Sequence, residues 1–163
     1  MIFVTVGSQK FQFNRLIKAV DALVASGAAK GGAFAQTGAC TYIPEHMEHE
    51  AFLDRESFRS QMDACDVVVT HGGTGAIIGA VKDGKKVIAV PRLAKYGEHV
   101  DDHQIEIVNQ FGEMGLIEPC LDPEDLSEAY ARATTKNYLP YRSNTTHFCA
   151  DLSEYIDSLE GDR

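Results

Sequence analysis

The sequence is poor in basic residues and contains no cluster of them. Lysine and arginine together number 15 against 24 aspartate and glutamate residues, which gives a formal net charge of −9. General binding to nucleic acid needs a cationic surface that displaces counterions from phosphates, so this class of function is excluded. A phosphate-bearing ligand would have to be held by local donors instead.

Paired cysteines and long apolar runs are also missing. The four cysteines are far apart, with no Cys-x-x-Cys pair, which argues against a zinc or dithiol site and favours free thiols in a reducing cytosol. No apolar run approaches the roughly 20 residues of a membrane span, and the first residues lack the charged region and cleavage site of a signal peptide. We therefore expect a cytoplasmic location.

The sequence does contain apolar, β-branched runs that alternate with helical patterns. With 163 residues, 44% of them hydrophobic, the chain is long enough for one core, so we expect a single domain over residues 1–163. Strands are predicted at residues 2–6, 33–37, 67–70 and 87–90, and short ones at 42–44 and 116–117. This alternation predicts an α/β fold with a Rossmann-like parallel sheet and helices on both faces.

A glycine-rich loop follows the strand at residues 67–70. The segment 71–75 reads His-Gly-Gly-Thr-Gly and leads into a helical pattern that ends near Gly84. Such a loop lets backbone N–H groups approach a phosphate at the positive end of a helix. Glycines also occur between a strand and a helix because the turn needs unusual backbone angles. The two interpretations stay open at this point.

Two further segments carry polar side chains. Residues 92–104 follow the strand at 87–90 and so leave the carboxyl end of a strand, where ligands bind in open α/β sheets. Residues 45–50 contain His46 and His49 among acidic side chains. The zinc-protease order is absent there, so we expect a solvated loop or helix start rather than a metal site.

The C-terminal residues 144–160 form an amphipathic helical pattern. Its apolar stripe comprises Phe148, Leu152, Tyr155, Ile156 and Leu159. We expect this stripe to pack on the protein's own sheet, and a partner chain is the alternative.

Three motifs in this order resemble one known family. They are residues 4–8 with 13–16, the loop 70–75, and Pro91-Arg92 followed by residues 97–99 and 101–104. Together they resemble the small, donor-binding subunit of two-component bacterial exopolysaccharide glycosyltransferases, which is related to the C-terminal domain of glycosyltransferase family 28. The resemblance extends over residues 1 to about 133.

The resemblance implies half of an enzyme of the GT-B type. This half would bind a UDP-sugar and transfer a hexose, with inversion, to a lipid-linked saccharide in exopolysaccharide or capsule synthesis. A membrane-anchored glycosyltransferase subunit would bind the acceptor and recruit this chain to the inner face of the membrane. The resemblance implies that the chain alone is inactive, and it implies no metal or other cofactor.

The resemblance also implies a set of site residues. Contacts to the donor diphosphate are implied for seven residues of three loops: Gly7, Ser8, Gly72, Gly73, Thr74, Gly75 and Arg92. Contacts to the donor sugar are implied for Glu98, His99, Asp102, His103 and Gln104. Many family 28 enzymes hold the ribose with a glutamate on the helix after the glycine loop, and this chain has Gly79 there.

Proton transfer requires a general base, for which His71 and His103 are the candidates in this chain. His71 at a strand end can equally hold the loop by hydrogen bonds, and in GT-B enzymes the base generally comes from the acceptor half. Two other functions stay open: a non-catalytic activator of a membrane glycosyltransferase and a free-standing nucleotide-processing enzyme. A partner-binding face could also make the isolated chain self-associate.

Overall fold

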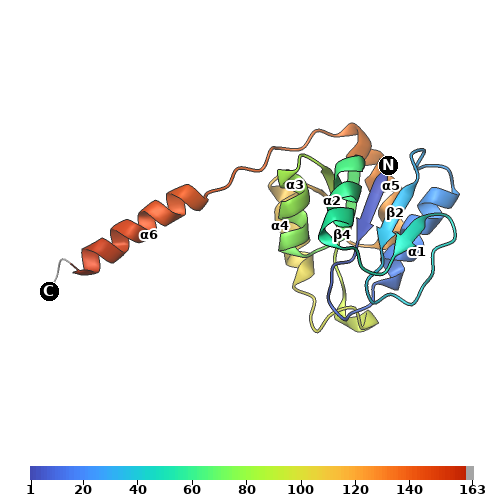
Figure 1. Ribbon diagram of the computed structural model, residues 1–163, viewed down its shortest axis with the longest axis horizontal. Coiled ribbons are helices and arrows are strands. Elements are labelled where there is room, and N and C mark those ends of the chain that lie inside the picture. The colour runs from blue at the N-terminus through green and yellow to red at the C-terminus, as the bar shows by residue number, and fades with distance from the viewer. Residues whose placement is uncertain (161–163) are drawn as a thin grey trace.

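A six-stranded parallel sheet forms the centre of the molecule in a computed structural model, which describes residues 1–160 (Figure 1). Its order is β3-β2-β1-β4-β5-β6, and each neighbouring pair is parallel. The strands are β1 (Ile2–Thr5), β2 (Ala33–Gln36), β3 (Glu48–Glu50), β4 (Val67–His71), β5 (Lys86–Val90) and β6 (Glu118–Pro119). The expected Rossmann-like α/β sheet is therefore confirmed.

Helices cover both faces of the sheet, as expected. Alternate side chains of β1, β4 and β5 enter two separate apolar clusters because strand residues point to opposite faces. One cluster includes helices α1 (Asn14–Ala25) and α5 (Leu126–Thr135), the latter preceded by the short helix η2 (Pro123–Asp125). The other includes α2 (Arg55–Ala64), α3 (Thr74–Lys82) and α4 (Gln104–Glu113).

The chain reverses its winding direction between β1 and β4, which are neighbours in the sheet. The helix after β1 packs on one face, and the helix after β4 packs on the other. Beyond their loops the two segments therefore run to opposite faces of the sheet, which leaves room for a crevice at its carboxyl edge. Ligands of doubly wound folds bind at this switch point.

Two short strands differ from the sequence-based expectation. Residues 42–44 form no strand; the edge strand is β3, in the acidic segment that we expected to be a loop or helix start. All three residues of β3 are exposed, although its backbone pairs with β2. Its sequence therefore has no hydrophobic pattern from which a strand could be predicted. The last strand, β6, lies two residues beyond the expected residues 116–117.

The C-terminal region first follows the body and then leaves it. The Leu139 amide donates to the Gly115 carbonyl at 2.8 Å, the Tyr138 hydroxyl donates to Glu118, and Tyr141 packs on the α2–α3–α4 side. Beyond residues 142–144, α6 (Thr145–Glu160) extends away from the domain (Figure 1).

The apolar stripe of α6 is exposed. Its five large apolar side chains have exposed fractions of 46% to 62%: Phe148, Leu152, Tyr155, Ile156 and Leu159. The expectation that this helix packs on its own sheet is therefore wrong, and the alternative of a partner stays open. Among the described residues, no helix has the length and apolarity needed to cross a membrane.

Candidate donor-binding site

Arg92 fastens the loop after β5 to the loop after β1. Its guanidinium donates to the carbonyl oxygens of Val6, Phe11, Gln12 and Glu98, and the side chain is 2% exposed. The planar guanidinium, with five donors, suits this bridging of several carbonyls. The buried Arg92 side chain thus holds together two loops of the expected site, the one after β1 and the one after β5.

Gln104 joins the same loop to the glycine loop. Its Oε1 accepts the amide protons of Gly72 and Arg92, each at 3.1 Å. A Cβ on Gly72 would lie 2.8 Å from the Gln104 Cβ, so only glycine permits this close approach. The loops after β1, β4 and β5 therefore meet at one edge of the sheet, as the family resemblance implied.

His71 lies between two of the glycines. A Cβ on Gly73 would lie 2.4 Å from its Nε2, and a Cβ on Gly7, whose φ is +77°, would lie 2.8 Å from its Cε1. The Thr70 hydroxyl lies 3.3 Å from Nδ1 and also donates to the Thr5 carbonyl. The imidazole therefore packs as a spacer between the first two loops.

The electrostatics of His71 agree with this structural role. Burial, with a smaller contribution from the nearby Arg92 charge, lowers its pKa from 6.5 to about 4. An imidazole with so low a pKa is a weak base near neutral pH. We therefore assign His71 to holding the loop, which corrects the expectation that it is a candidate general base.

This shifted pKa predicts a loss of stability in acid. The unfolded state takes up the proton as the pH falls below 6.5, whereas the folded state resists protonation until about pH 4. Between pH 7 and pH 4 the wild type should lose about 3 kcal/mol of unfolding free energy from this residue alone. Urea denaturation across this range should show a smaller loss for His71→Asn, because other groups titrate equally in both proteins. Parallel pH profiles would contradict the assignment.

The first turn of α3 is the accessible part of the glycine loop. Gly73 is the N-cap residue and no side chain caps the helix, so the amides of Thr74 and Gly75 open this turn. Thr74 and Gly75 are exposed, whereas the Gly72 amide is buried against Gln104 and the Gly73 amide donates to the His71 carbonyl. Residues 72–75 were all expected to bind an anion, but only Thr74 and Gly75 are accessible for it.

A cavity of about 370 Å³ lies beside this turn. Gly7 and Ser8 line it from the loop after β1, and one face of α3 from Gly75 to Asp83 lines it from the side. Gln36, Phe58 and Met62 complete its wall, and sequence patterns did not indicate them because their strand and helix are distant in the chain. A larger depression of about 510 Å³ lies between α1 and α5, outside the glycine loop.

Two charged residues of the expected site serve the protein interior. Glu98 is 0% exposed, receives Arg15 through two hydrogen bonds of 2.8 and 2.9 Å, and accepts the Leu93 amide. Arg92 is equally occupied by backbone carbonyls. The expected direct contacts of Glu98 with the sugar and of Arg92 with the diphosphate are therefore replaced by roles in holding the loops.

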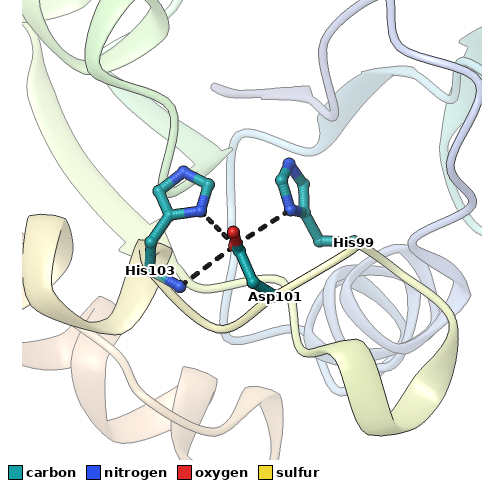
Figure 2. Close-up of side chains that lie close together, drawn as sticks. All are labelled: His99, Asp101 and His103. Atoms are coloured by element: carbon teal, nitrogen blue, oxygen red, sulfur yellow. Dashed lines mark hydrogen bonds and ion pairs between the residues drawn. The ribbon is translucent and has the colours of Figure 1, made fainter.

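The remaining candidates lie near the start of α4 (Figure 2). His99 and His103 face Asp101, and the His103 contact lowers the pKa of the Asp101 carboxyl. Asp102 accepts the Ala94 amide at 2.7 Å and remains exposed. Sequence reasoning missed Asp101, although the alternating His-x-Asp-x-His spacing was a usable signal.

A family comparison identifies the type of domain that carries this site. The model of the glycosyltransferase family 28 C-terminal domain matches residues 1–156. The chain belongs to this family. The family 28 domain therefore includes α6 up to Ile156 as well as the sheet and the three loops.

Individual relatives agree with this assignment. The chain is 26% identical over 126 residues to the UDP-N-acetylglucosamine transferase subunit ALG13 of Homo sapiens, which covers 73% of this chain and 11% of that protein. The crystal structure of the glycotransferase of kitacinnamycin has a similar fold, with a TM-score of 0.55 at 17% identity, over 83% of this chain and 35% of that one. The chain thus spans a minor part of both proteins. The family match makes it a domain of the glycosyltransferase family 28 type.

Proposed function

We propose that this family 28 domain is the donor-binding subunit of a two-part, inverting glycosyltransferase. It would use a UDP-sugar to add a hexose to a lipid-linked saccharide in exopolysaccharide or capsule synthesis. The observation that carries the proposal is the accessible first turn of α3, which opens beside a cavity at the switch point. The human relative is by name a subunit of a UDP-N-acetylglucosamine transferase, which supports both the nucleotide and a second chain.

In this proposal the donor diphosphate lies against the first turn of α3. The amides of Thr74 and Gly75 and the positive end of the helix dipole offset its charge, and Ser8 approaches from the loop after β1. The nucleoside lies along α3 in the cavity, where Gln36 and Asp83 supply polar groups to its wall. No metal ion enters this scheme.

Catalysis then follows from charge that develops on the leaving diphosphate. Donors that are already oriented toward this charge lower the barrier without reorganisation during the reaction. The acceptor hydroxyl must lose a proton, and we assign that base to the partner chain. His103, with 47% of its side chain exposed, stays the candidate in this chain for contacting the donor sugar.

The partner that we propose is a membrane-anchored subunit that binds the acceptor and docks on α6. The exposed stripe of α6 offers an apolar surface, and the acidic side chain of Asp151 lies beside it. Glu154 and Asp157 add negative charge on the opposite side of the helix. A complementary surface is therefore an apolar groove with a basic rim. Docking would hold this cytoplasmic chain at the inner face of the membrane, and without the partner the same stripe would favour self-association.

Calorimetric titration of the isolated full chain with UDP and UDP-sugars tests the donor site. We expect saturable binding of UDP without turnover of a UDP-sugar. Failure to bind any uridine nucleotide would overturn the donor site and favour a non-catalytic activator. Turnover by the isolated chain would instead support a free-standing enzyme.

Co-expression with the product of the neighbouring reading frame tests the partner. The two chains should co-purify and transfer sugar, and Leu152→Asp should abolish co-purification while UDP binding persists. Ser153→Asp is the matched control, because it adds the same charge outside the apolar stripe. Equal co-purification of both variants would show that α6 is not the docking element.

A further inference from the structure

Three side chains with metal-ligating atoms meet in the loop between η1 (Ala94–Tyr96) and α4 (Figure 2). The Nδ1 of His99 lies 3.3 Å from the Oδ1 of Asp101, and the Nδ1 of His103 contacts the same oxygen. The three ligand atoms all lie within 4.8 Å of one another. Both imidazole rings turn Nδ1 toward the carboxylate between them.

His99 supplies an independent sign that a ligand is expected here. Its side chain is 11% exposed, and its Nδ1 is buried without a hydrogen-bond partner. The 3.3 Å separation from Asp101 is within ion-pair distance, but the two groups are not aligned for a hydrogen bond. A buried polar atom left without a partner is unfavourable, because it has lost its hydrogen bonds to water. A cation at this position would accept the nitrogen lone pair.

We propose that His99, Asp101 and His103 form a binding site for a divalent transition-metal cation of the Zn²⁺ type. Two imidazole nitrogens and one carboxylate oxygen suit zinc, cobalt and nickel, whereas magnesium and calcium favour oxygen ligands throughout. Three protein ligands leave one tetrahedral position for water or for an oxygen of another molecule. The chain's net charge of −9 also favours uptake of a cation.

The surroundings of the three residues combine one fixed ligand with two adjustable ones. The His99 ring packs against Phe11, with ring centres 5.3 Å apart, and is held in place. The side chains of Asp101 and His103 are 59% and 47% exposed, so small rotations can bring them into coordination. Ligand atoms of a tetrahedral zinc site lie roughly 3.4 Å apart, as its bond lengths of about 2.1 Å require. The 3.3 Å between His99 Nδ1 and Asp101 Oδ1 already matches this spacing, whereas His103 must move away from Asp101 to reach it.

Other histidine–carboxylate contacts in the described residues lack a third ligand. His46 faces Asp21, whose carboxylate already accepts the Tyr42 hydroxyl and two backbone amides. His147 faces Asp151 on the surface of α6. Neither pair belongs to a group of three metal-ligating residues, whereas His99, Asp101 and His103 do.

This inference departs from the expectation that the protein binds no metal. The site lies in the loop before α4, separate from the first turn of α3 to which the donor diphosphate is assigned. His103 is shared with the proposed contact to the donor sugar, and binding of the metal alone decides this inference independently of that contact.

Titration of the untagged, chelator-treated full chain with Co²⁺ and Zn²⁺ tests the site. Visible absorption of Co²⁺ and calorimetry of Zn²⁺ should each show one equivalent bound at pH 7.5. His103→Ala and Asp101→Ala should each weaken the affinity at least about 10-fold, because each removes a ligand. Both side chains are substantially exposed, so we expect these variants to fold, and circular dichroism checks this.

Two variants control for binding elsewhere. His147→Ala removes the exposed histidine of α6, and Cys149→Ser removes the exposed thiol. Both should bind the metal as the wild type does. The proposal is overturned if the wild type binds no stoichiometric metal, or if His103→Ala and Asp101→Ala bind as tightly as the wild type. A loss of binding confined to either control variant would overturn it as well.

Discussion

Replacement of Arg92 by methionine is expected to lower the free energy of unfolding by about 3–5 kcal/mol, a large part of a domain's stability. The guanidinium is 2% exposed and bonds to the carbonyls of Val6, Phe11, Gln12 and Glu98. Methionine would fill much of the volume but leave these carbonyls without their donors. Unsatisfied buried acceptors account for most of the loss.

Urea denaturation at pH 7 measures this effect, and Arg142→Met is the matched control. Arg142 lies in the exposed segment before α6, so the same chemical change should alter stability by less than about 0.5 kcal/mol there. Arg92→Lys should recover only part of the loss, because an ammonium cannot reproduce the guanidinium's fork of donors. A loss below 1 kcal/mol for Arg92→Met would show that the loops are held by other contacts.

Substitution of Gly79 by tryptophan is expected to weaken UDP binding at least about 100-fold, because the indole would occupy the cavity along α3. Gly79 lies on the exposed cavity face of the helix, and a Cβ there would meet no atom within 4 Å. The variant should therefore fold. Calorimetric titration with UDP measures the change.

Gly79→Ala separates the cavity from the helix itself. Alanine should leave UDP binding close to that of the wild type and raise the unfolding free energy by about 0.5–1 kcal/mol, because glycine is unfavourable within a helix. A folded Gly79→Trp protein that binds UDP as the wild type does would show that the nucleotide does not lie against α3.

The core elements could be predicted because burial is visible in their sequences. The runs in β1, β4 and β5 are mostly apolar and almost wholly buried, since helices cover both of their faces. The edge strand β3 was missed because its Glu-His-Glu residues remain exposed while its backbone pairs with β2. Its existence depends on a neighbour rather than on its own composition.

The site was predictable at the level of loops and less so at the level of side chains. The loops after β1, β4 and β5 contain glycine and polar residues, and they were expected at the carboxyl edge of the sheet. The structure places all three loops at that edge. Arg92 and Glu98 were expected to contact the donor, since a sequence does not reveal that a charge is buried among carbonyls or against Arg15. For α6, periodicity indicated a covered face but could not say which molecule covers it.

The anchoring of the C-terminal segment also determines how two chains could meet. Residues 137–140 lie beside Val81, Gly84 and Lys86, where α3 ends and β5 begins, which is the edge of the sheet opposite the glycine loop. Only residues 142–144 separate Tyr141 from α6, a reach of roughly 10 Å when extended. A subunit that binds α6 and also covers the proposed donor crevice must therefore contact this chain at two separate sites. Once that subunit has bound α6, its second contact, at the crevice, is an intramolecular step that depends on its effective concentration there. The second contact can then form and break while the two chains stay bound through α6.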